Sequence, residues 1–212
     1  MYIDHPASFT DYYELTMAQG YYLSGTYQKK ASFDYFFRKV PFQGGYVIFA
    51  GLKELIDTIK HITFSQEEIA YLKSEGFADS FIDYLKNFSF KGSIWSVKEG
   101  EIVFPNEPIL RVEGNLLETQ IIETLLLNIL NFQSLIATKA ARIKQSSRGQ
   151  MLMEFGLRRG QGLGAIQGAR AALIGGADFS SNVGASRIFG FPPKGTHAHS
   201  MVQVFMGLGE GE

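Results

Sequence analysis

The longest apolar stretch of the chain, residues 116–136 (LLETQIIETLLLNILNFQSLI), constrains the fold most, because it must either cross a membrane or lie in a protein core. Glu118 and Glu123 interrupt it, and a charge at the middle of a bilayer is costly. Its leucine and isoleucine side chains recur at helical spacing. Asn115, followed three residues later by Glu118, is typical of a helix start. The stretch therefore predicts a buried helix of a soluble protein and not a membrane span.

The composition excludes several classes of protein. The 212 residues are 45% hydrophobic and 19% charged, which is enough to bury a core and is not typical of disorder. The 20 basic and 21 acidic residues leave a net charge of −1, so we expect no nucleic-acid partner and no polybasic membrane contact. No cysteine is present, which excludes disulfides and thiolate chemistry. Residues 1–9 contain Asp4 and no basic segment before an apolar core, so we expect no secretory signal and a cytoplasmic protein.

Residues 1–135 predict an α+β domain that the long helix completes. Two pairs of residues indicate helix starts: Asp11 with Glu14, and Ser65 with Glu68. Three aromatic or β-branched runs indicate strands: residues 31–40, 91–98 and 101–104. The first helix is expected to run through Tyr22, and Glu99-Gly100 to join the last two strands.

Residues 136–212 are expected to form the beginning of an α/β barrel. Residues 151–155 and 177–180 predict strands, residues 165–174 predict a helix between them, and residues 195–200 are expected to begin a third unit. Alternation of strands and helices favours parallel βα units.

The ends of these predicted strands carry polar and charged residues. Chemistry lies at the C-terminal ends of strands in parallel sheets and βα barrels, so we expect residues 155–159, 180–182 and 197–200 to share one functional face. The segment E-F-G-L-R-R at 154–159 holds adjacent arginines, which can bind a phosphate or carboxylate with parallel hydrogen bonds. The alternative is that one arginine pairs with Glu154 or another local acid and the other is a surface charge.

Two histidines lie in the segment G-T-H-A-H-S at residues 195–200. Imidazole titrates near neutrality and can serve as an acid, a base, a phosphoryl acceptor or a metal ligand. The spacing of His197 and His199 is compatible with a metal pair, but no carboxylate lies nearby in the sequence, so we predict no protein-bound metal. The alternative is that both are solvated loop residues.

Read together, six segments resemble the nicotinate phosphoribosyltransferase family: TDYYELTMAQGYY, FFRKVPFQGGYVIFAGL, EGEIVFPNEPILRVEG, LLETQIIETLLLNILNFQSLIATKAAR, EFGLRRGQG and GTHAHS. They occur in the order of the family and cover nearly the whole chain up to about Val204. The resemblance implies that nicotinate and 5-phosphoribosyl 1-diphosphate are joined to give nicotinate mononucleotide and diphosphate, in NAD salvage. It also implies that ATP hydrolysis drives the reaction through a phosphohistidine.

The resemblance further implies roles for single residues: His199 as the phosphohistidine, and substrate contacts for Tyr13, Phe155, Arg158, Thr196 and Ser200. Tyr13 and Phe155 are expected to pack on opposite faces of the pyridine ring, with Tyr13 supplied by the partner subunit. The chain is expected to form a homodimer or a higher homo-oligomer. Arg158 is expected to bind the anionic groups of the substrate. Mg²⁺ is expected to arrive with ATP and phosphoribosyl diphosphate.

The family's chains continue with further βα units beyond the segments found here. Residues 149–212 number 64, whereas a closed eight-unit barrel takes about 250 residues. We therefore expect at most three of eight strands, an incomplete TIM-like barrel, and activity that belongs to a longer polypeptide. Because the family's second nicotinate-binding arginine is not found, nicotinamide or quinolinate is an alternative substrate. A non-catalytic chain that only oligomerises or binds ligand is a third hypothesis.

Overall fold

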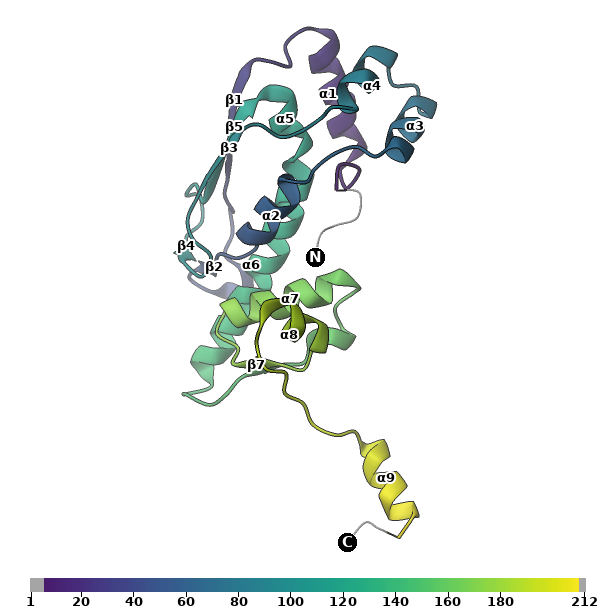
Figure 1. Cartoon of the computed structure of the whole chain (residues 1–212). Helices are drawn as coiled ribbons and strands as arrows, with labels where there is room; N and C mark the ends of the chain where they lie inside the picture. Colours follow the sequence, from purple (N-terminus) through teal and green to yellow (C-terminus); the bar gives the residue numbers. More distant parts are fainter. Residues whose placement is uncertain (1–5, 210–212) are drawn as a thin grey trace.

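The computed structural model describes residues 6–209 as two groups of elements joined by one long helix (Figure 1). Asp4, on which the expectation about a secretory signal rests, lies outside the described residues. In chain order, the first group comprises α1 (Tyr12–Leu23), β1 (Lys30–Tyr35), the 3-10 turn η1 (Pro41–Gln43), β2 (Val47–Ile48), α2 (Leu52–Ile59), α3 (Gln66–Ser74), α4 (Asp79–Leu85), β3 (Ser93–Ser96), β4 (Ile102–Val103), β5 (Leu110–Asn115) and α5 (Leu116–Ile121). The joining helix is α6 (Glu123–Ser146). The second group comprises β6 (Met153–Glu154), the 3-10 turn η2 (Gly156–Arg158), α7 (Leu163–Ile174), β7 (Phe179–Ser180), α8 (Val183–Phe189) and α9 (His199–Gly207).

All three predicted helix starts are confirmed, because Asp11, Ser65 and Asn115 are the N-caps of α1, α3 and α5. Of the three, Ser65 caps its helix with its side chain. The hydroxyl of Ser65 accepts a hydrogen bond from the backbone N–H of Glu68 at 3.2 Å. In return, Oε2 of Glu68 accepts one from the backbone N–H of Ser65 at 2.6 Å. Two N–H groups that the helix leaves without partners are thus satisfied locally, which is why the sequence pattern alone finds this start.

The strands of the first group form two antiparallel sheets, one with the order β1-β5-β3 and one pairing β2 with β4. The central strand β5 buries Leu110 and Val112 and exposes Arg111 on the opposite face, as alternation along a strand requires. The predicted strands at 91–98 and 101–104 exist but belong to different sheets. The turn at Gly100 explains this, because its N–H bonds the carbonyl oxygen of Phe49 at 2.8 Å and so directs the chain to β2.

The predicted core helix is present as α5 and α6, with a break at Ile122. Leu117, Leu125 and Ile129 of the predicted apolar stripe are buried, whereas Phe132, expected at its end, is exposed. By length and composition residues 116–146 pass as a membrane span, yet 56% of the most apolar window is buried inside the protein, and the core helix of a soluble protein passes the same test. The predicted domain boundary at 135/136 lies within α6, so the two groups share one helix.

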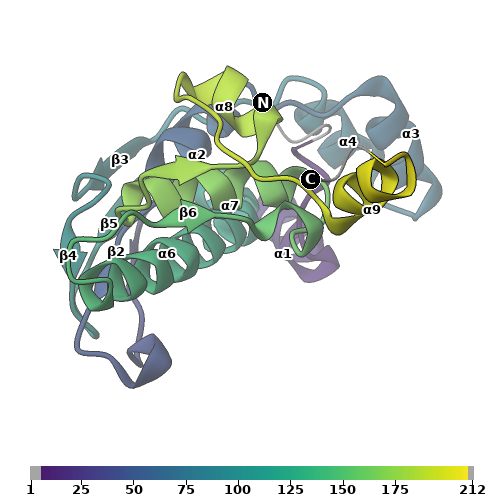
Figure 2. The same ribbon diagram turned by 90° about the horizontal axis from the view of Figure 1, so that it is seen from below.

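The second group is built from parallel pairings, with α6 and α7 side by side (Figure 2). β6 pairs with β7 in parallel, and a single parallel bridge joins Ser180 to Pro193. A Cβ at Gly175, where α7 ends, would fall inside contact distance of the carbonyl oxygen of Ala137, so only glycine lets the two helices approach this closely. These pairings are the ones expected of the first βα units, and the incomplete TIM-like barrel stays a prediction.

Residues 195–200, which are expected to begin a third βα unit, contain no strand. The chain reaches the sheet earlier, at Pro193, and then leaves it (Figure 1). Because proline has no N–H to donate, a strand ladder is not extended through Pro192 and Pro193. Residues 195–198 form a loop, and α9 begins at His199 and projects away from the rest of the protein.

Candidate functional site

A chain of hydrogen bonds joins the C-terminal ends of β6 and β7. Ser180 Oγ donates to Oε2 of Glu154 at 2.6 Å, and the backbone N–H of Asn182 donates to Ser180 Oγ at 3.0 Å. The other oxygen of Glu154 accepts from the N–H of Gly156. Ser180 and Asn182 are buried. The carboxylate of Glu154 is therefore engaged within the protein, and the alternative that it pairs with a neighbouring arginine is wrong.

Phe155 and Arg158 lie on the turn that follows β6. Phe155 is the N-cap of η2, and 46% of its surface is exposed. Arg158 and Arg159 are exposed, and within the described range 6–209 neither guanidinium forms a hydrogen bond or an ion pair. An exposed ring and an unpaired guanidinium on the same short turn suit a flat aromatic acid, because the ring can stack and the cation can bind the carboxylate.

Tyr13 lies on α1, in the other group of elements. Its side chain is half exposed, and α1 packs against α4 and α5 (Figure 1). Among the residues that the structure describes, no ring contact joins Tyr13 to Phe155. The two rings predicted to sandwich a pyridine thus do not meet within one chain.

The histidine segment lies apart from the strand ends. The backbone N–H of Lys194 donates to the carbonyl oxygen of Ser180 at 3.1 Å, and its ammonium lies 3.6 Å from the ring centroid of Phe179. Beyond this point Thr196, His197, His199 and Ser200 are all exposed. Of the three segments expected to share a face, 155–159 and 180–182 therefore come together, and 197–200 does not. Sequence periodicity could not show this, because the direction of a loop is set by contacts outside it.

The described part of the chain contains no cluster suited to a metal ion. Within residues 6–209, no group of three or more histidine, aspartate or glutamate side chains is placed so that it could hold one.

An ion pair that the sequence did not reveal joins the two groups of elements. Arg170 on α7 donates to both carboxylate oxygens of Glu99, at 2.6 and 2.9 Å, and Glu99 also accepts the N–H of Gly51 at 2.6 Å. Burial tends to raise the pKa of Glu99, but the hydrogen bond and charge of Arg170 outweigh it, so this pKa is lowered. Arg170 is the one charged residue in the helix LGAIQGARAALI. A single charge in an otherwise apolar helix is the sequence feature from which a buried ion pair could have been predicted.

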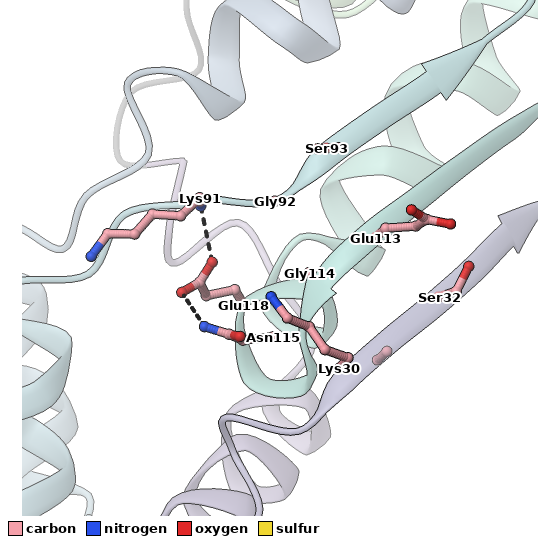
Figure 3. Close-up of a pocket in the computed structure, with 10 residues that line it drawn as sticks. Lys30, Ser32, Lys91, Gly92, Ser93, Glu113, Gly114, Asn115 and Glu118 are labelled. Atoms are coloured by element: carbon pink, nitrogen blue, oxygen red, sulfur yellow. Dashed lines mark hydrogen bonds between the residues drawn. The ribbon is translucent and has the colours of Figure 1, made fainter.

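A cavity of about 540 Å³ lies at one end of the three-stranded sheet (Figure 3). Glu118, buried at its base, accepts hydrogen bonds from the backbone N–H of Lys91 at 2.9 Å and from Asn115 Nδ2 at 3.1 Å. Lys30 and Glu113 line the same cavity, so its charges balance. None of the predicted site residues lines it, and we do not assign the substrate to it.

Comparison with known proteins gives a consistent result. The family model described as nicotinate phosphoribosyltransferase (NAPRTase) N-terminal domain matches residues 9–131. The nicotinate phosphoribosyltransferase of Bacillus subtilis is 50% identical over 198 residues, covering 92% of this chain and 40% of the relative. The crystal structure of human nicotinic acid phosphoribosyltransferase superposes with a TM-score of 0.86 at 35% identity, covering 92% of this chain and 40% of that one. A nicotinate-nucleotide pyrophosphorylase from Pyrococcus furiosus superposes with a TM-score of 0.77 at 26% identity, covering 95% of this chain and 45% of that one. The chain thus spans less than half the length of these proteins.

Proposed function

Because this chain belongs to the nicotinate phosphoribosyltransferase family, we propose that it serves in the transfer of a phosphoribosyl group from 5-phosphoribosyl 1-diphosphate to nicotinate, in NAD salvage. The pyridine nitrogen forms a bond to C1 of the ribose, the bond from C1 to the diphosphate oxygen breaks, and nicotinate mononucleotide and diphosphate are released. The observation that carries the proposal is the unpaired guanidinium of Arg158 on the same turn as the exposed ring of Phe155. Stacking and charge-assisted hydrogen bonds of this kind suit an aromatic carboxylate.

The remaining parts of the proposal concern how the site is completed. We place the transfer in a cytoplasmic homodimer in which Tyr13 of one subunit covers the pyridine ring held by Phe155 of the other. The half-exposed ring of Tyr13, which has no contact with Phe155 within residues 6–209, supports this arrangement. The parallel pairing of β6 with β7 and the bridge at Pro193 support the start of a TIM-like barrel around the site.

The phosphohistidine belongs to the same proposal. His199 takes the γ-phosphoryl group of ATP: a bond forms between phosphorus and an imidazole nitrogen, the bond between the γ-phosphorus and the bridging oxygen breaks, and ADP leaves. Mg²⁺ enters bound to the phosphates of ATP and of phosphoribosyl diphosphate. His199 is the first residue of the nine-residue helix α9, and the N-terminal end of a helix stabilises added negative charge. Thr196 and Ser200 flank the histidine and supply hydroxyl contacts to the ligand.

Labelling with ATP that carries a radioactive γ-phosphate tests the assignment of the histidine. We expect acid-labile label on the wild-type protein and on the matched control His197→Ala, and none on His199→Ala. In the presence of nicotinate and phosphoribosyl diphosphate, His199→Ala should lose ATP-stimulated turnover and keep slow transfer at saturating substrate. Undiminished ATP stimulation in His199→Ala would contradict the assignment of His199 as the phosphohistidine. A wild-type protein that forms no nicotinate mononucleotide would contradict the proposed phosphoribosyl transfer.

A second candidate is phosphoribosyl transfer to another pyridine, nicotinamide or quinolinate. The segments that carry the resemblance contain only one of the two arginines expected to bind nicotinate, Arg158, and this keeps the second candidate open. Diphosphate release measured with each pyridine in turn separates the candidates. We expect the highest kcat/KM with nicotinate, and a higher value with quinolinate or nicotinamide would select the second candidate.

A further inference from the structure

Glu14 is a buried carboxylate that the proposed reaction does not use. It follows Tyr13 directly in the first turn of α1, and none of its surface is exposed. Burial raises the pKa of Glu14, although hydrogen bonds from Thr124 and Gln120 act in the opposite direction. A carboxylate taken out of water is costly unless its oxygens are hydrogen-bonded. The hydrogen-bond donors around Glu14 therefore indicate which parts of the structure it holds together.

The partners of Glu14 lie on both sides of the break between α5 and α6. Thr124, in the first turn of α6, donates from Oγ1 to Oε1 of Glu14 at 2.8 Å. Gln120, near the end of α5, donates from Nε2 to Oε2 of Glu14 at 3.3 Å and to Oε2 of Glu123 at 2.8 Å. The break itself is at Ile122. One carboxylate thus fastens the first turn of α1 to the junction of two helices more than a hundred residues away in the sequence.

The orientation of the Tyr13 ring depends on this attachment more than the orientation of the Tyr12 ring does. The ring of Tyr12 packs edge-on against Phe77, with 5.7 Å between ring centroids. In the described part of the chain, Tyr13 has no ring contact of its own. The charge of Glu14, followed by burial and the charge of Glu123, raises the pKa of the Tyr13 hydroxyl, so the carboxylate and the phenol interact. The direction of the Tyr13 ring is therefore set by how the first turn of α1 is held.

We propose that Glu14 is a positioning residue for Tyr13: by clamping the first turn of α1 to the α5–α6 junction, it sets the plane in which the Tyr13 ring meets the pyridine. The inference rests on the proposed function, which brings Tyr13 to the substrate. A displacement of about 1 Å in a positioning group can cost about a hundredfold in rate. Loss of the Glu14 hydrogen bonds next to Tyr13 is therefore expected to have a large effect on how the Tyr13 ring meets the substrate.

Fluorine NMR of the full chain labelled with 3-fluorotyrosine tests the inference, with the Tyr13 signal assigned by its loss in Tyr13→Phe. Glu14→Ala should shift and broaden the Tyr13 signal before any ligand is added. It should also raise the Kd for nicotinate by about tenfold or more, while the Kd for phosphoribosyl diphosphate stays unchanged. Glu14→Gln should restore both, because its carboxamide oxygen still accepts the Thr124 hydroxyl. Thr124→Val, a milder change, should reproduce part of the effect.

Glu118→Ala is the matched control, because Glu118 is also a buried carboxylate, lies on α5 and bonds residues away from α1. It should leave the Tyr13 signal and the Kd for nicotinate as they are in the wild type. An unchanged Tyr13 signal in Glu14→Ala, or an equal change in Glu118→Ala, would overturn the inference. If the wild-type Tyr13 signal does not respond to nicotinate, the proposed substrate contact of Tyr13 fails. The ligand-free spectra of Glu14→Ala and Glu14→Gln then still decide whether Glu14 positions the ring.

Discussion

Replacement of Arg170 by methionine tests how the two groups of elements are held together. Arg170 donates two hydrogen bonds to Glu99, and the two side chains are only 14% and 17% exposed. Methionine keeps much of the apolar contact but leaves the Glu99 carboxylate with the backbone N–H groups of Gly51 and Lys53 and no cation. Removal of one partner of a buried ion pair costs about 3–5 kcal/mol. Because Glu99 keeps some exposure and its backbone hydrogen bonds, we expect a loss of about 3 kcal/mol in the free energy of unfolding, at the lower end of that range.

The loss should depend on pH in a defined direction. In the wild type, burial tends to raise the pKa of Glu99, but Arg170 lowers it below its usual value. The stability that the pair contributes is then fully present above the unfolded pKa of about 4.3 and is lost as the pH falls through the lower folded pKa. In Arg170→Met the lowering contribution is gone and the pKa of Glu99 rises. The difference in stability between variant and wild type should therefore shrink between pH 7 and pH 4.

Urea unfolding followed by circular dichroism at both pH values measures this difference. Lys86→Ala is the control, since Lys86 forms an exposed ion pair with Asp83 and its removal should leave the midpoint unchanged. The double variant Glu99→Gln/Arg170→Met should be more stable than Arg170→Met alone, because it no longer buries an unpaired charge. A loss below about 1 kcal/mol in Arg170→Met, or a double variant as unstable as the single one, would refute the reasoning.

Two further substitutions test the second group of elements. Gly175→Ala should lower the free energy of unfolding by about 2 kcal/mol, because the new methyl group meets the carbonyl oxygen of Ala137. Gly164→Ala on α7, where a Cβ would touch only the ring of Phe132 at 4.0 Å, should be neutral or stabilising in the same urea titration. Ser180→Ala should cost about 1–3 kcal/mol, because Glu154 and a buried backbone N–H each lose a partner, and a thermal midpoint equal to the wild type would contradict the role of that hydroxyl.

Features determined within a few residues of sequence were predictable. The start of α3 follows from Ser65 and Glu68 alone, because each satisfies the other's backbone N–H. The buried helix followed from apolar spacing, which depends only on helical periodicity. The break at Ile122 was not predictable in this way, since the side chains on either side of it bond Glu14, which is far away in the sequence.

In the candidate site, too, features set by neighbouring residues were predictable and features set by distant residues were not. The sequence placed Phe155 at the end of a strand and Arg158 just after it; in the structure the strand ends at Glu154, and both residues lie on the turn that follows. It could not show whether Arg158 is available, because that depends on Glu154 being engaged by Ser180 on another strand. The position of His199 likewise depends on where the chain goes after Pro193, and no local pattern sets that direction. Whether these residues act together stays a prediction.

Calorimetric titration of nicotinate and of nicotinamide tests most directly whether this chain recognises a pyridine carboxylate. Hydrogen bonds to a charged group are worth about 1.5–3 kcal/mol, which corresponds to about 10- to 150-fold in affinity. We therefore predict that nicotinate binds about tenfold or more tightly than nicotinamide, that Arg158→Met removes this preference, and that the matched variant Arg159→Met keeps it. Equal affinity of the wild-type protein for the two pyridines, or no binding of nicotinate, would contradict the account.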